Sequence, residues 1–341
     1  MLAGARARSR EAFNTLLMPH FCMLAGARVR SRPEDGPSRL ADTVLPFRAM
    51  SPSRVPDRAV WVNGRVVRGD AATVSVFDRG ARDGGGLFET LRVYGGRPFA
   101  WERHMERLVL SAAELGFPVP PSPSRLRDAV GEVLEACDLS DAVVRITVTR
   151  GVAGGRPVRT GAWAEAEPLG SRLWPGARQR DPDDGGPLGG RAVLSQTPFT
   201  PGFLGRHKTT SRLAWDLARE EARAAGADEV LLVSPDGEVL EGAASNVFVV
   251  RSGGDVFTPP LSANVLPGVT RATVLELCEP LGILVHEAPI PLEMLRWASE
   301  VFVTNSVQEL LPLREIAGRP VPEREVTLRL LECYRARVAG S

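Results

Sequence analysis

Residues 226–250 read GADEVLLVSPDGEVLEGAASNVFVV, and this stretch decides the fold. EVLLV, EVLEG and NVFVV are short apolar runs of the kind that forms buried strands, and Pro-Asp-Gly between the first two predicts a tight turn. The three runs therefore predict an antiparallel meander. Just before them, apolar residues recur at helical spacing, and one of Thr209 to Ser211 is expected to cap a helix that ends at Gly226. The face of that helix is expected to consist of Leu213, Leu217, Ala218, Ala222 and Ala225.

The pattern continues on both sides of this stretch. Upstream, Asn63-Gly64 and Gly95-Gly96 predict two hairpins, and helices are expected near 101–116 and 124–136 before the strand AVVRITVTRG. Downstream, LPGVTRATVLELCEPLG predicts a helix, EVFVTNS a strand and SVQELLP a short helix. The fold class is therefore α/β (α+β).

Four segments are predicted from these patterns. Residues 1–57 are rich in Arg, Ser and Pro and repeat the phrase MLAGAR, so we expect a disordered extension, with a transit peptide as the alternative. Residues 58–165 are expected to form a small α+β domain, 166–190 a linker with an insertion, and 191–341 a larger cofactor-binding domain.

Composition narrows the possible functions. The 341 residues carry a formal charge of +1, so no overall field favours nucleic acid or an anionic membrane, and small-molecule partners are expected. No apolar run reaches the ~20 residues that span a bilayer. The cysteines and histidines are scattered, which predicts neither a disulfide framework nor a metal site and is typical of a reducing cytoplasm.

Lys208 is the most informative residue. The 42 Lys and Arg residues comprise 41 arginines and this one lysine. An arginine cannot lose its proton to become a nucleophile, so a retained lysine indicates Schiff-base chemistry, either with a carbonyl substrate or with pyridoxal phosphate. The alternative is an accidental surface lysine in an arginine-rich sequence.

Other residues suit a pyridoxal phosphate site. Glu241 ends a predicted strand and could pair with the pyridine nitrogen of the cofactor, although a solvated strand-end glutamate is the commoner case. Phosphate binds at helix N-termini, which are expected at Val269 and Thr270 and again at Ser306 and Val307. Arg107 could add a balancing charge, and each hydroxyl could equally be a simple cap.

The series RHMERL, HKTTSRL, GADEVLLVSPDGEVLEGAASNVFVV, FTPPLSANVLPGVTR and SEVFVTNSVQELLPL resembles the class IV aminotransferases. These are pyridoxal-phosphate enzymes of fold type IV and include branched-chain and D-amino acid aminotransferases and aminodeoxychorismate lyases. The resemblance covers about residues 60 to 337. It implies two α/β domains, the larger a pseudo-barrel, with the cofactor between them in a homodimer.

The resemblance also assigns roles. Lys208 would be the Schiff-base lysine and catalytic acid/base, and Glu241 the partner of the pyridine nitrogen. Leu266 would pack against the ring, and the residues matching the phosphate-binding positions are Arg107, Val269, Thr270 and Ser306. Val307 is a further candidate for substrate binding.

The subfamily is left open. FET at 88–90 and Leu213 differ from the FEG and tyrosine typical of branched-chain enzymes, and only Tyr94 and Tyr334 are tyrosines. Arg145 and Arg156 resemble basic positions that hold substrate carboxylates in aminodeoxychorismate lyases, or they are surface strand charges. The expected reaction is amino transfer from an amino acid to a 2-oxo acid, with release of pyruvate and 4-aminobenzoate from aminodeoxychorismate as the alternative and an idle cofactor-binding protein as the remote one.

Overall fold

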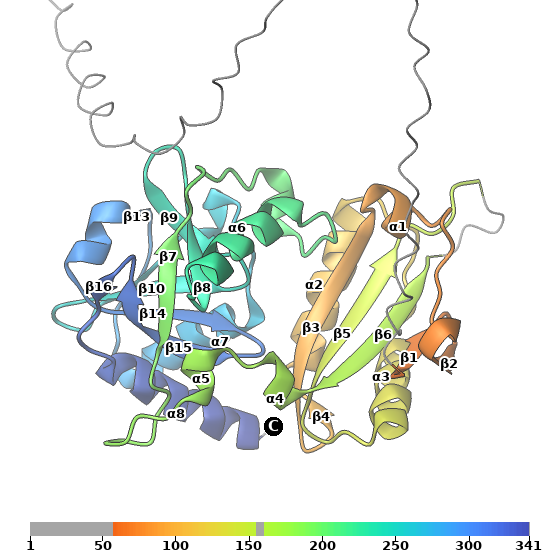
Figure 1. Ribbon diagram of the computed structural model, residues 1–341, viewed down its shortest axis with the longest axis horizontal. Helices are drawn as coiled ribbons and strands as arrows, with labels where there is room; N and C mark the ends of the chain where they lie inside the picture. Colours follow the sequence, from red (N-terminus) through yellow and green to blue (C-terminus); the bar gives the residue numbers. More distant parts are fainter. Residues whose placement is uncertain (1–56, 155–159, 341) are drawn as a thin grey trace, which may run out of the picture. The chain divides into compact units, whose positions relative to one another are not determined.

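The computed structural model describes residues 57–154 and 160–340, which form two β-sheets and the helices that pack against them (Figure 1). The expected extension, 1–57, lies outside the described residues except for Asp57. The α-helices are α1 Arg79–Asp83, α2 Trp101–Glu114, α3 Pro123–Cys137, α4 Leu169–Arg172, α5 Pro175–Arg178, α6 Leu213–Ala224, α7 Val269–Cys278 and α8 Glu325–Ala339. The 3-10 helices are η1 Gly69–Ala71, η2 Phe203–Arg206, η3 Leu261–Ala263, η4 Glu279–Leu281 and η5 Leu292–Arg296.

The first sheet is six-stranded and antiparallel, with the order β2-β1-β6-β5-β3-β4. Its strands are β1 Ala59–Val62, β2 Arg65–Arg68, β3 Gly86–Tyr94, β4 Arg97–Pro98, β5 Ala142–Thr149 and β6 Ala162–Pro168. Helices α2 and α3 pack against one face of this sheet and share one apolar core with it. Both expected hairpins are confirmed, with Asn63-Gly64 and Gly95-Gly96 at positive φ in their turns.

Strand β3 presents different residues on its two faces because side chains alternate along a strand. Leu87, Leu91 and Val93 lie in the core beneath the helices. The intervening side chains, Phe88, Thr90, Arg92 and Tyr94, therefore lie on the opposite face. Arg145 of β5 is the cross-strand partner of Thr90 and belongs to that second face.

The second sheet is ten-stranded and mixed, with the order β12-β11-β10-β14-β15-β7-β8-β9-β13 and with β16 paired to β15. Its strands are β7 Gly190–Leu194, β8 Glu229–Val233, β9 Glu238–Gly242, β10 Asn246–Arg251, β11 Val256–Thr258, β12 Val285–Glu287, β13 Ile290–Pro291, β14 Ala298–Asn305, β15 Glu309–Ile316 and β16 Arg319–Pro320. Strands β9 and β10 contact each other although four strands separate them in the order, so the sheet curls into a half barrel.

Both faces of the curled sheet are buried. Val247 and Val249 of β10 join the core inside the curl, whereas Phe248 and Val250 pack with α7 and α8 on the outside. This explains why the apolar runs of the sequence are nearly continuous rather than alternating. The α/β (α+β) class and the half barrel agree with the expectation from the sequence.

Three local expectations are wrong. Strand β10 does not continue the β8 and β9 hairpin, because β11 and β14 are its neighbours in the sheet. Residues 306–312 form a turn and the start of β15 instead of a short helix. Helix α6 begins at Leu213 without a side-chain cap, and Leu213 and Leu217 are exposed while Ala218 and Ala222 face the core.

The predicted linker, 166–190, includes the end of β6 and the short helices α4 and α5. The division into two domains stays a prediction. Among the described residues, no helix is long and apolar enough to cross a membrane.

Candidate functional site

A cavity of about 240 Å³ collects nearly all the residues that the sequence singled out. Its walls include side chains from the second face of the first sheet and from the ends of strands β9, β10 and β14 of the half barrel. The predicted residues that line it are Arg107, Arg145, Lys208, Glu241, Leu266, Val269, Thr270, Ser306 and Val307. Arg156 lies outside the described residues.

Lys208 lies in the segment between η2 and α6, which runs alongside β3. The amide of Phe88 donates to the carbonyl of Lys208 at 2.9 Å, and the amide of Thr210 donates to the carbonyl of Gly86, also at 2.9 Å. The hydroxyls of Thr210 and Ser211 donate to the carbonyl of Gly84 at 2.8 and 3.0 Å, so they anchor the lysine segment instead of capping α6. The lysine is thus positioned by backbone pairing with the first sheet.

The Lys208 amine titrates far below the range of an ordinary lysine, with its pKa near neutral pH. Its Nζ lies 4.8 Å from the centre of the Phe88 ring. Burial, followed by the positive charges of Arg107 and Arg212, lowers the pKa of Lys208 to about 7. An amine with this pKa is available both as a nucleophile and as a base.

Glu241 is a buried carboxylate at the end of β9, with 4% of its surface exposed. The indole Nε1 of Trp215 donates to its Oε1 at 3.1 Å, and the amide of Leu266 donates to its Oε2 at 3.0 Å. Burial raises the pKa of Glu241 to about 7 against the effect of these donors. A cation placed beside it would favour the charged carboxylate.

The start of α7 and the end of β14 offer unused hydrogen-bond donors. Gly268 precedes α7 without a side-chain cap, so the first amides of the helix, at Val269 and Thr270, have no capping acceptor. Across the cavity, the buried Thr304 Oγ1 has no hydrogen-bond partner within the described residues. Ser306 beside it makes only a 3.4 Å contact with His104. An anion is the ligand that such donors fit.

Arg107 is held in a network that the sequence did not reveal. Its Nε and Nη2 bond Glu89 at 2.8 and 2.6 Å, and its Nη1 donates to the carbonyl of Pro267 at 2.9 Å, which leaves two of its five N–H groups free for a ligand. Glu89 also contacts His104 at 2.7 Å. Burial alone would raise the pKa of Glu89, but Arg107 and His104 together lower it to about 2. In the sequence, the one signal that could have indicated this network is the spacing of His104 and Arg107, which places both on one face of the helix.

The opposite end of the cavity is rich in arginine. Arg145 lies with its Cζ 3.7 Å from the centre of the Phe88 ring, and no ion pair joins it to any described residue. Arg212 bonds the carbonyl of Ala243, and burial lowers the pKa of both Arg145 and Arg212. Two further arginines of this wall, which sequence reasoning also missed, are Arg172 and Arg219. Such a wall favours a carboxylate ligand.

The comparisons with known sequences and with solved structures agree on one protein family. The model of the amino-transferase class IV family matches residues 86–316. A putative branched-chain-amino-acid aminotransferase of Methanocaldococcus jannaschii is 34% identical over 81% of this chain and 95% of its own. The D-alanine aminotransferase of Bacillus licheniformis is 30% identical over 77% of this chain and 89% of its own. Among solved structures, the branched-chain amino acid aminotransferase of Escherichia coli superimposes with a TM-score of 0.73, at 30% identity, covering 82% of this chain and 94% of that one.

Proposed function

The chain belongs to the amino-transferase class IV family, whose members use pyridoxal 5'-phosphate, and from this premise we propose that it transfers an amino group from an amino acid to a 2-oxo acid. The relatives described above are aminotransferases of the branched-chain and D-amino acid types. One observation carries the proposal: the sole lysine of the chain, with its pKa lowered to about 7, lines the same cavity as the buried Glu241.

The cavity fits the cofactor. The phosphate of the cofactor would meet the uncapped amides of Val269 and Thr270 on one side and Thr304 Oγ1 and Ser306 on the other, with Arg107 beside the start of α7. Leu266 would pack against the ring, and Glu241 would pair with the pyridine nitrogen. When bound, the cofactor accepts the electrons of the bond that breaks at the substrate α-carbon.

The residues of this chain supply attachment and proton transfer. Lys208 would hold the cofactor covalently through its amine and, when that amine is free, would carry the α-proton of the substrate. Glu241, fixed by Trp215 and Leu266, would keep the pyridine nitrogen protonated. Burial, with the nearby guanidinium groups of Arg107 and Arg212, lowers the pKa of the lysine amine to about 7, so the amine can both give up and take up a proton near neutral pH.

Arg145 is proposed to bind the side-chain carboxylate of an acidic substrate, with Arg212 nearby in the same wall and Val307 as a further substrate contact. The binding of a substrate carboxylate by Arg156 stays a prediction. The homodimer and the cytoplasmic location also stay predictions. The lyase alternative also stays a prediction, since the relatives described above are named aminotransferases.

A substrate panel tests the reaction and the role of Arg145 together. We expect the L- or D-enantiomer of a branched-chain amino acid, alanine or glutamate to give its 2-oxo acid only when a 2-oxo acid acceptor is present. Arg145→Met should raise the KM of glutamate by about 10- to 100-fold, equivalent to the loss of a charge-assisted hydrogen bond of about 1.5–3 kcal/mol. The KM of a branched-chain amino acid should change much less.

Arg97→Met is the matched control, because Arg97 is an exposed residue of β4 and should leave every KM unchanged. Pyruvate released from aminodeoxychorismate without an acceptor would favour the lyase instead. A chain that binds the cofactor and converts no member of the panel would be the idle protein.

The pH dependence of cofactor capture follows from the lysine pKa. Only the neutral amine attacks an aldehyde, so the rate of capture should rise with pH, pass its midpoint near 7 and level off above it. A lysine with its ordinary pKa of about 10.4 would keep gaining rate up to pH 10. Arg212→Gln removes a neighbouring positive charge and should move the midpoint to higher pH, whereas Arg223→Gln on the exposed part of α6 should not. Stopped-flow absorbance measures both, and a midpoint near 10 in the wild type would contradict this account.

A further inference from the structure

Glu309 is a buried carboxylate outside the predicted catalytic residues. It opens β15 with 2% of its surface exposed and a φ of +62°, a left-handed conformation that residues other than glycine rarely adopt. Such a conformation persists only where the surroundings determine it, and it is often found beside ligand sites. The contacts of Glu309 show what holds it.

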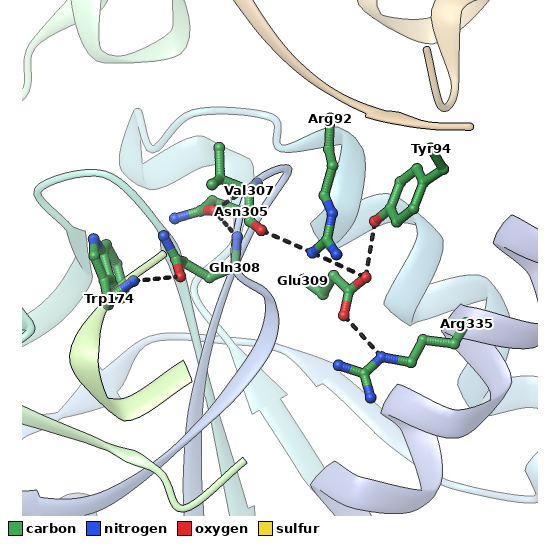
Figure 2. Close-up of polar contacts among 8 residues, drawn as sticks. All are labelled: Arg92, Tyr94, Trp174, Asn305, Val307, Gln308, Glu309 and Arg335. Carbon is green, nitrogen blue, oxygen red and sulfur yellow. Dashed lines mark hydrogen bonds and ion pairs between the residues drawn. The ribbon is translucent and has the colours of Figure 1, made fainter. Parts of the chain in front are cut away.

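Three side chains from two distant parts of the chain converge on Glu309 (Figure 2). Arg92 Nη1 lies 3.1 Å from its Oε1, and the Tyr94 hydroxyl donates to the same oxygen at 2.8 Å. Arg335 Nε of α8 donates to the other oxygen at 2.9 Å. Arg92 and Tyr94 come from the cavity face of β3, so this cluster ties the first sheet to the half barrel.

Arg92 also reaches the turn that precedes Glu309. Its Nη1 donates to the carbonyl of Val307 at 3.1 Å (Figure 2). Within the turn, the Oδ1 of Asn305 accepts from the amides of Val307 and Gln308 at 2.9 and 2.7 Å. The Gln308 side chain accepts from the Trp174 amide at 3.0 Å and so fixes the far side of the turn. The groups left without strong partners are Thr304 Oγ1 and Ser306, which line the cavity.

A second branch of the cluster reaches α7. Tyr334 of α8 lies in the apolar core that α8 shares with α7. Burial and the charge of Glu309 raise the pKa of Tyr334 and of Tyr94, whereas the nearby hydroxyls of Thr270 and Tyr94 lower that of Tyr334. Thr270 lies in the first turn of α7, whose amides face the same cavity. The two elements that offer donors to an anion are therefore both linked to Glu309.

We infer that Arg92, Tyr94 and Glu309 are positioning residues, which hold the 304–308 turn, meaning the end of β14 and the turn after it, and the start of α7 at the separation that binds a phosphate group. The inference rests on the proposed function, because the phosphate is that of the proposed cofactor. None of the three residues lines the cavity, so they act through the turn and the helix rather than on the ligand.

The test compares two ligands that differ only by the phosphate. The full-length protein, freed of cofactor, is titrated with pyridoxal phosphate and with pyridoxal, using the fluorescence of Trp174 and Trp215 beside the cavity. Arg92→Met and Tyr94→Phe should weaken pyridoxal phosphate binding by about 10- to 100-fold, the effect of losing a supporting hydrogen bond behind a binding group. Pyridoxal binding should change less than about twofold.

Inorganic phosphate provides a second measurement. Its inhibition constant, measured in competition with pyridoxal phosphate, should be higher in both variants than in the wild type. Arg337→Met is the control, because Arg337 is on the same helix as Arg335 and its side chain, among the described residues, bonds Glu276 at the surface rather than Glu309. If Arg92→Met fails to fold, Tyr94→Phe, which removes a single hydroxyl, decides the question.

The outcomes separate the two levels of the account. A wild type that binds pyridoxal phosphate no better than pyridoxal would overturn the proposed function. A wild type that prefers pyridoxal phosphate, with variants that keep that preference in full or lose affinity for both ligands equally, would overturn only the positioning role.

Discussion

Replacing Lys208 by arginine should abolish amino transfer and the part of the visible absorbance that depends on the covalent bond between the lysine and the cofactor. Arginine keeps the positive charge and most of the length of the side chain but cannot act as a nucleophile or carry the α-proton. Loss of general acid–base catalysis alone costs about 10²–10⁴-fold, and loss of covalent attachment adds to it. Turnover of the best donor in the panel, followed as 2-oxo acid formation, measures the effect.

Arg223→Lys is the complementary control. Arg223 is an exposed residue of α6 paired with Glu220, so exchanging arginine for lysine there should change neither turnover nor colour. Normal turnover in Lys208→Arg would remove the basis of the proposed mechanism.

Glu241→Gln should lower kcat by about 10²–10³-fold, comparable to the loss of one preorganised electrostatic contact in an active site. The amide keeps the shape of the side chain but cannot hold the pyridine nitrogen protonated, so the electron-accepting power of the cofactor falls. The affinity for the cofactor should fall much less, because the phosphate contacts are intact. Steady-state kinetics and cofactor titration together measure this split.

Glu238→Gln, on the same strand, is the control and should leave kcat unchanged. An unaltered kcat in Glu241→Gln, or a loss of cofactor affinity as large as the loss of kcat, would indicate that Glu241 has a structural role only.

The sequence predicted individual elements well because their signals are local. The hairpin at Asn63-Gly64 depends on positive φ in two adjacent residues, and helix α2 depends on apolar spacing that ends before Gly116. Lys208 and Glu241 could be singled out by chemical type alone. Their presence in one cavity is a structural finding.

The errors concern long-range order. The position of β10 could not be read from its neighbours in sequence, because β14 and β11 arrive from later in the chain. The expected helix at 306–312 overlooked Pro312, which disfavours a helix interior, and the continuous apolar run that pairs with β14 in the buried sheet.

The supporting residues were missed for the same reason. Glu89 and Arg92 lie on opposite faces of β3 and serve different partners, Arg107 on one side and Glu309 on the other. In the sequence, both look like charged residues of a strand, with nothing to indicate their partners. Only the fold shows that α2 covers one face and the 304–308 turn the other.

The central claim is that Lys208 carries the cofactor, and reductive trapping tests it most directly. The full-length protein is incubated with pyridoxal phosphate, reduced with borohydride, digested and analysed by mass spectrometry. Because the chain contains a single lysine, we expect one phosphopyridoxyl group, on the peptide that contains Lys208, and its loss when the amino-acid donor is added before reduction. A phosphopyridoxyl group found only at the N-terminal amine, or none at all, would contradict the account.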